Sequence, residues 1–253
     1  MNKIVIDNNK LLSYSDDSVI VDSKSIEFLK NSNYKIEIVN TNKLNLNIKV
    51  RANIMVKIFL FSVDNDISVN VKYELDDNSN LVVYKFYNNI NNNIYEEIYL
   101  NGNNSSIYYN LSSISKNVED YKMVIYHNNY NVKSNISNRC VGMDGSKVTY
   151  SIDSILEKGN TNCVMNQDTK IICMGDVDAK VEPNMIIDED DVEARHGSVI
   201  GKFSYDDLFY LLSRGISEEV AISLMIKGFI MGHLDLNKKD EEKIIKIIKN
   251  EME

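Results

Sequence analysis

Alternation of apolar and polar residues constrains the fold of this chain more than any other feature of its sequence. Across roughly residues 17–187 apolar side chains return at every second position, as in KLNLNIKV (43–50) and ISVNVKYEL (67–75). A period of two sends successive side chains to opposite faces of a β-strand, one toward a core and the next toward solvent. The sequence therefore predicts a mainly β body made of many short strands.

Clusters of Asn, Asp, Ser and Gly separate these strands, and such residues favour turns. Many short strands at regular spacing are typical of a sandwich, a barrel or a β-solenoid, and the spacing alone does not choose among the three. The many Asn residues would suit ladders at the turns of a solenoid. A biased composition explains their number equally well.

The periodicity becomes helical after Gly201. Ser204 and Asp207 form a start that resembles a capping box, and Leu residues then recur at helical spacing. Gly215 suits the position just after a helix end, and Ser217 is placed to cap a second helix. The sequence therefore predicts a short helical segment behind the β body.

The expected organisation is a β body over residues 1–203, with a short N-terminal segment, and a helical domain over 204–253 whose last helix covers 238–252. Because an open β end needs cover, we expect the helices to close one end of the body. The first helix is unusually apolar, and side chains such as Phe209 and Tyr210 cannot all face one side. Part of this helix should therefore be available to a partner.

Composition excludes several classes of function. The formal net charge is −9 and no block of Lys and Arg stands out, which argues against a nucleic-acid partner and against docking on anionic lipid. No apolar run reaches the roughly 18 residues of a membrane helix, and the start lacks a signal-peptide core, so we expect a cytoplasmic protein. Three cysteines without a CxxC pair predict neither a disulfide framework nor a four-thiolate metal site.

Four segments follow one another in the last third of the chain: NQDTK (166–170), VEPNMIIDEDDVEARHGSVIG (181–201), LFYLLSRGIS (208–217) and AISLMIKGFI (221–230). In order and spacing they resemble the C-terminal part of the SufB/SufD family, the scaffold components of the Suf iron–sulfur cluster assembly machinery. The resemblance implies a β-helix followed by a small helical domain, with no enzymatic activity of its own. It also implies docking of an ABC ATPase, SufC, on the C-terminal helices, and pairing through the β-helix with a second family chain or with itself.

The chain departs from the family pattern in three ways. The N-terminal helical extension of the family is missing or reduced to a few residues. Asp168 stands where SufB-type chains carry a cysteine, although Cys163 and Cys173 flank this position. Gly197 follows His196 where SufB has a Glu, which is the SufD-like choice.

The resemblance directs attention to His196 as a residue of cluster formation. A neutral imidazole is a good iron ligand and a proton acceptor near neutral pH, and the competing interpretation is a histidine that only stabilises a turn. The other candidates are two thiols and two carboxylates: Cys173, Cys163, Glu193 and Asp191. The alternative role for the thiols is that of small buried hydrophobes, and for the carboxylates that of a solvated face. We expect a transient iron–sulfur cluster at a subunit interface and no tightly bound cofactor.

For the ATPase, the resemblance implies a docking surface at Phe209, Tyr210, Arg214 and Gly215. Two other functions remain open from the residues alone: a structural β-solenoid and a carbohydrate-processing β-helix enzyme. Such an enzyme needs clustered carboxylates and aromatic side chains that stack on sugars. Trp is absent, and the neighbouring pair Glu96–Glu97 should point to opposite faces of a strand.

Overall fold

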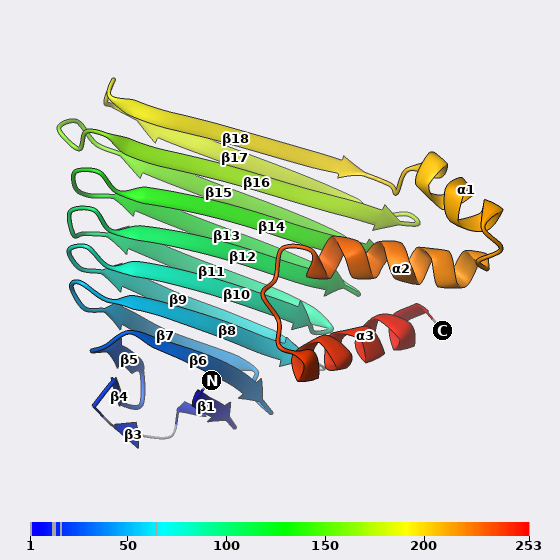
Figure 1. Ribbon diagram of the computed structural model, residues 1–253, viewed down its shortest axis with the longest axis horizontal. Coiled ribbons are helices and arrows are strands. Elements are labelled where there is room, and N and C mark those ends of the chain that lie inside the picture. The colour runs from blue at the N-terminus through cyan, green and yellow to red at the C-terminus, as the bar shows by residue number, and fades with distance from the viewer. Residues whose placement is uncertain (1, 12–13, 16, 64, 253) are drawn as a thin grey trace.

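The computed structural model describes residues 2–11, 14–15, 17–63 and 65–252. It shows a β-solenoid of two stacked, mainly parallel sheets followed by three helices, of which the second and third lie against one side of the solenoid (Figure 1). From β6 onward successive strands alternate between the sheets, and each strand pairs with the strand two places along the chain. The prediction of a β-helix followed by helices is therefore confirmed. The parallel pairing between coils, which strand spacing cannot reveal, excludes the sandwich.

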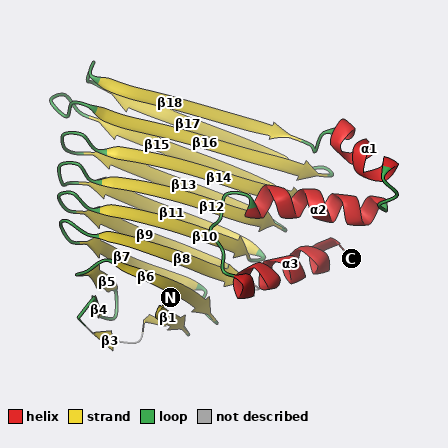
Figure 2. Cartoon of the chain, in the orientation of Figure 1, coloured by secondary structure: helices red, strands yellow, loops and turns green. Residues whose placement is uncertain are grey.

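The first sheet contains, in chain order, β1 (Asn2–Asp7), β2 (Lys10–Leu11), β6 (Ser32–Val39), β8 (Met55–Val63), β10 (Asn80–Asn88), β12 (Ser106–Ser115), β14 (Lys133–Met143), β16 (Cys163–Met174) and β18 (Val192–Gly201). The second sheet contains β3 (Tyr14–Ser15), β4 (Val19–Val21), β5 (Ser25–Phe28), β7 (Lys43–Val50), β9 (Ile67–Leu75), β11 (Asn91–Leu100), β13 (Val118–His127), β15 (Lys147–Leu156) and β17 (Asp178–Ile187). Figure 2 shows the two layers of strands stacked coil upon coil.

The core lies between the sheets, where the apolar phase of every strand meets. Parallel pairing stacks equivalent positions of successive coils, so that Ile58, Val83, Tyr109 and Ile136 form one buried row across the first sheet. The same alternation puts polar side chains on the outer faces. The period of two in the sequence is therefore the cause of a core that runs the length of the solenoid.

One corner of the solenoid is made by a ladder of asparagines. Asn53, Asn78, Asn104, Asn131 and Asn162 all have positive φ, between 54° and 63°. Each side-chain amide after the first donates to the side-chain oxygen of the preceding rung, over 2.7–3.0 Å. Asn tolerates the left-handed conformation better than most residues. The ladder thus accounts for part of the asparagine content that composition left unexplained.

The two ends of the solenoid differ. At the N-terminal end, β2 pairs antiparallel with β1, and β3, β4 and β5 form an antiparallel group. At the C-terminal end β17 and β18 are the last strands of their sheets, and neither has a further neighbour in the described residues. This end of the core is open: side chains of both strands are half-buried or exposed along their length.

Three helices follow β18: α1 (Tyr205–Ser213), α2 (Glu218–Met231) and α3 (Lys238–Met252). The predicted start of the first helix is confirmed, because the Ser204 side chain accepts a hydrogen bond from the Asp207 amide at 3.4 Å. Gly215, at φ 80°, follows the end of α1. Among the described residues, no helix is both long enough and apolar enough to cross a membrane.

The expectation that the helices close an end of the solenoid is wrong. Helices α2 and α3 lie along the outer face of the first sheet instead (Figure 1). This outer face is apolar beneath them, and the contact buries Phe59, Phe61, Phe86, Ile114 and Val141 of the sheet with Ile226, Ile230, Ile244 and Ile248 of the helices. Strand β8 therefore carries apolar side chains on both of its faces where the helices cover it. This apolar outer face explains where the helices pack.

Candidate functional site

His196 lies on the inner face of the last strand. In the register of β18 on β16 it stands beside Gln167, which continues the row of Ile136 and Tyr109. The row is apolar or aromatic in the inner coils, and it becomes polar in the last two. His196 is exposed because no further strand covers the open end. The structure thus places the histidine at an open strand edge.

The two candidate thiols lie at opposite ends of β16. Cys163 is its first residue and Cys173 its eleventh, so ten residues separate them, or about 33 Å along a strand. His196 pairs with Gln167, between the two. One cluster of a few ångströms cannot reach both thiols. Among the described residues, no three His, Cys, Asp or Glu side chains are arranged to hold a metal ion.

Each thiol has a different environment. Cys163 donates to the carbonyl oxygens of Asn160 and Asn129 at 3.3 and 3.4 Å, and burial raises the pKa of its thiol. Burial also raises the pKa of the half-buried Cys173 thiol, which the nearby Lys202 ammonium partly offsets. Cys140 is fully buried in β14, and its pKa is well above the ordinary value for the same reason. All three are thus favoured as thiols in this chain.

The candidate carboxylates are also divided. Asp191 precedes β18 and is near Cys163, where its charge contributes to the raised pKa of that thiol. Glu193 points away from the core and forms an exposed ion pair with Arg195 at 2.8 Å. His196 is therefore the one proposed residue on the inner face of β18, whereas Asp191 lies at its start and Glu193 on its outer face.

The sequence did not reveal a charged and hydroxylic cluster inside the solenoid. Lys85 and Glu96 form a fully buried ion pair, and Glu96 Oε2 accepts hydrogen bonds from Tyr109 and Tyr121 at 2.6 and 2.8 Å. Burial lowers the pKa of the Lys85 ammonium, and the Glu96 carboxylate opposes this effect. The sequence did contain an indication of this cluster, because Lys85 and Glu96 occupy positions that alternation assigns to the buried face of their strands. The outward position of Glu97 confirms that the neighbouring carboxylates face opposite sides.

Gln167 was missed for the same reason. It occupies the apolar phase of β16, between Met165 and Thr169, and its side chain is only 4% exposed. The side chain spans the core from the first sheet to the second. Its Nε2 donates to Ser154 Oγ at 2.7 Å and to the carbonyl oxygen of Asn184 at 3.3 Å.

Helix α1 carries two of the predicted docking residues, Phe209 and Tyr210, and the other two, Arg214 and Gly215, directly follow it. None of its residues is buried, and Phe209 and Tyr210 are each 58% exposed. The Arg214 guanidinium lies over the Tyr210 ring, 5.2 Å from its centroid. Tyr205 and Phe209 stack at 6.3 Å. An exposed aromatic patch of this kind marks an interaction surface more often than a free helix face.

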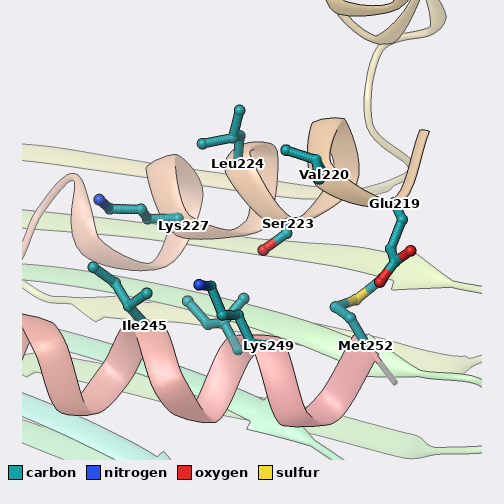
Figure 3. A pocket seen from close by; sticks show the side chains of 9 residues that line it. Glu219, Val220, Ser223, Leu224, Lys227, Ile245, Lys249 and Met252 are labelled. Carbon is teal, nitrogen blue, oxygen red and sulfur yellow. The ribbon is translucent and has the colours of Figure 1, made fainter. Parts of the chain in front are cut away.

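A separate groove lies between α2 and α3 (Figure 3). It has a volume of about 400 Å³. Its lining consists of apolar side chains with two lysines, a serine and a glutamate: Val220, Leu224, Ile245, Ile248, Met252, Lys227, Lys249, Ser223 and Glu219. Val220 and Leu224 remain 50% and 45% exposed at its edge.

Comparison with known proteins defines the class to which this fold and these helices belong. Residues 43–229, well over half of the chain, match the model of the SufBD core domain of the SUF system of iron–sulfur cluster assembly. The chain belongs to the SufBD family of iron–sulfur cluster assembly proteins.

Individual relatives agree with this membership over shorter stretches. SufD of Bacillus subtilis is 34% identical over 76 residues, which are 30% of this chain and 17% of the relative. SufB of the same organism is 33% identical over 108 residues, 40% of this chain and 22% of the relative. A SufBD family protein of Pyrococcus horikoshii is 46% identical over 48 residues, 19% of this chain and 11% of the relative. The matched segments thus span less than a quarter of each of these relatives.

Proposed function

We propose that this chain is a non-enzymatic scaffold on which a transient iron–sulfur cluster is assembled, in the cytoplasm, with a SufC-type ABC ATPase and a second SufBD-family chain or a second copy of itself. The observation that carries the proposal is the open end of the solenoid, with His196 on the inner face of its last strand. Membership of the SufBD family supports iron–sulfur cluster assembly as the process in which the chain takes part. The three free cysteines agree with a reducing compartment.

The open end supports the partner chain. An unpaired strand edge is a template for pairing with another chain, and proteins normally shield such edges. Here β17 and β18 present about ten residues each without shielding, and apolar side chains remain exposed on them: Ile186 at 59%, Val199 at 51% and Ile200 at 46%. A second solenoid that docks edge to edge would place further strands beside these side chains, and Ile200, on the inner face of β18, would become part of a continuous core.

In this assembly His196 acts as an iron ligand or as a proton acceptor when the cluster forms. The remaining ligands come from the partner chain, because within this chain Cys163 and Cys173 are too far apart to act together. Cys173, Cys163, Asp191 and Glu193 each stay candidates for a single contact with iron or sulfide.

The first prediction tests His196. His196→Ala should leave the fold and the ATPase interaction nearly intact, because an exposed side chain at an open edge contributes little to stability. Cluster formation should fall sharply, measured by visible absorbance after reconstitution of the complex. Assembly at the wild-type rate would contradict the assignment of this site. Loss of the thermal transition would instead make the histidine a structural residue.

The second prediction concerns the ATPase. The exposed face of α1 fits a docking surface, since aromatic and Arg side chains dominate the energetics of many interfaces. Tyr210→Ala combined with Arg214→Ala should weaken ATPase binding at least tenfold in a titration, while the thermal unfolding of the β body is unchanged. Lys249→Ala, in the α2–α3 groove, is the matched control for a general change of the helical surface. Unchanged affinity of the double variant would place the docking surface elsewhere.

A further inference from the structure

The position of Gln167 is unusual for a buried amide. Its Nε2 faces three acceptors on the second sheet: Ser154 Oγ at 2.7 Å, the Asn184 carbonyl at 3.3 Å and the Ile152 carbonyl at 3.5 Å. Carbonyl oxygens only accept, so the NH₂ side of the amide must lie toward them. This fixes the orientation of the amide without any need to choose between its two flipped forms.

The amide oxygen of Gln167 consequently points away from the second sheet. Oε1 is buried and has no hydrogen-bond partner in the described part of the chain. A buried acceptor left unpaired costs about 1–3 kcal/mol, so proteins rarely keep one without a reason. The neighbour of Gln167 on the open side is His196, in direct register on β18 and on the same inner face.

We propose that Gln167 is the positioning residue of His196: the exposed imidazole turns to donate one ring N–H to the unpaired Oε1 of Gln167, which holds the other ring nitrogen as a free lone pair. This inference rests on the proposed function, and it says how the His196 ring is oriented to act as an iron ligand or proton acceptor. In metal sites, a ligating histidine is usually oriented in this way by an acceptor on its second nitrogen. Gln167 is itself fixed across the core by Ser154 and Asn184, so it orients the ring from a rigid support.

The experiment reads the imidazole tautomer in the cluster-free protein. The chain has three histidines, and ¹⁵N long-range correlation spectra of the ring nitrogens resolve three side chains, with His196→Ala for assignment. At alkaline pH, where imidazole is neutral, wild-type His196 should show one pyrrole-like and one pyridine-like nitrogen. In Gln167→Met, which keeps the length and removes the acceptor, the two shifts should converge as the tautomers interchange.

Thr169→Val is the matched control, since Thr169 is a buried polar residue on the same face of β16, two positions further along. It should leave the His196 spectrum as in the wild type. If wild-type His196 already shows averaged shifts, or if Gln167→Met leaves a single tautomer, the inference is overturned. Averaged shifts in the wild-type spectrum would overturn it even where a variant fails to fold.

The outcome is independent of cluster chemistry. Should Gln167→Met release the tautomer while His196→Ala assembles clusters normally, the positioning contact stands and the proposed function fails. Should the tautomer be unaffected while His196→Ala abolishes assembly, the proposed function stands and this inference fails.

Discussion

At the scale of single residues, the protein buries several ionisable side chains, both inside the solenoid and beneath the helices, although Lys, Glu and His are usually exposed. His127 is buried and bonded through Nε2 to Ser134 Oγ at 2.8 Å. His233, between α2 and α3, bridges Ser112 at 2.8 Å and Ser137 at 3.1 Å. Burial lowers the pKa of His127 to about 4 and that of His233 to about 3, the latter helped by the Arg139 charge.

These two histidines predict a loss of stability in mild acid. The unfolded chain takes up their protons below about pH 6.5, whereas the folded chain resists until its pKa values of about 4 and about 3. Their contribution is complete above about pH 6.5 and is lost as the pH falls. Between about pH 7 and about pH 5 each histidine should remove about 2 kcal/mol from the free energy of unfolding.

Urea titrations at the two pH values check this prediction, with His233→Asn as the comparison. The variant should show a difference between the two pH values that is smaller by about 2 kcal/mol. Glu119, whose pKa burial raises, acts in the opposite direction in both proteins and cancels in the comparison. An equal pH dependence of variant and wild type would show that His233 is not held neutral by the fold.

At the scale of elements, the sequence predicted the strands and the helix termini, because residues close together in the chain determine both. The strands follow from the period of two, and the helix termini lie where Ser204, Ser217 and Gly215 predicted them, although the Ser217 side chain makes no capping hydrogen bond. The position of the helices was not predictable in this way. It depends on the outer face of β8–β14 being apolar over a few positions, and this face exists only once the coils are stacked in register.

The candidate site shows the same limit. The junction histidine and the exposed α1 residues were identified from sequence motifs. The distance between Cys163 and Cys173 follows simply from both being on one strand, but the motif pattern had suggested that they flank a single site. Gln167 required the register of β16 and β18, because only pairing makes it the neighbour of His196.

The asparagine corner supplies a prediction at this scale. Asn131, at φ 54°, donates to Asn104 at 2.7 Å and accepts from Asn162 at 3.0 Å. Asn131→Ala should destabilise the chain by about 2–3 kcal/mol, from the strain of a positive φ together with the lost hydrogen bonds. Asn131→Gly loses the same bonds but tolerates the φ, so chemical denaturation should find it about 1 kcal/mol more stable than the Ala variant. Equal stability of the two variants would show that backbone conformation does not select Asn at this corner.

At the scale of the whole molecule, the two ends of the solenoid differ in how readily they would pair with another solenoid. The antiparallel strands at the N-terminal end break the parallel repeat, whereas β17 and β18 leave it open. A solenoid with two open ends would assemble into filaments, because each end would recruit another chain. An open edge at one end alone would admit one edge-to-edge neighbour, and two copies joined through it would form a closed pair rather than a fibre. This asymmetry supports assembly in pairs over the filament-forming alternative.

The corresponding prediction is a dimer that depends on the open end. Val199 and Ile186 are exposed on β18 and β17, and lysine at a strand edge opposes pairing. The double variant Val199→Lys, Ile186→Lys should sediment as a monomer while the wild-type chain sediments as a dimer, with the same thermal transition in both. Val220→Lys, on α2 at 50% exposure, adds a charge away from the open end and should remain dimeric. A wild-type chain that is monomeric by itself would contradict self-pairing and would make a second SufBD-family chain the partner to test in the same experiment. A double variant that still dimerises would show that the copies meet through another surface, and the covering of His196 by a partner would then lose its structural basis.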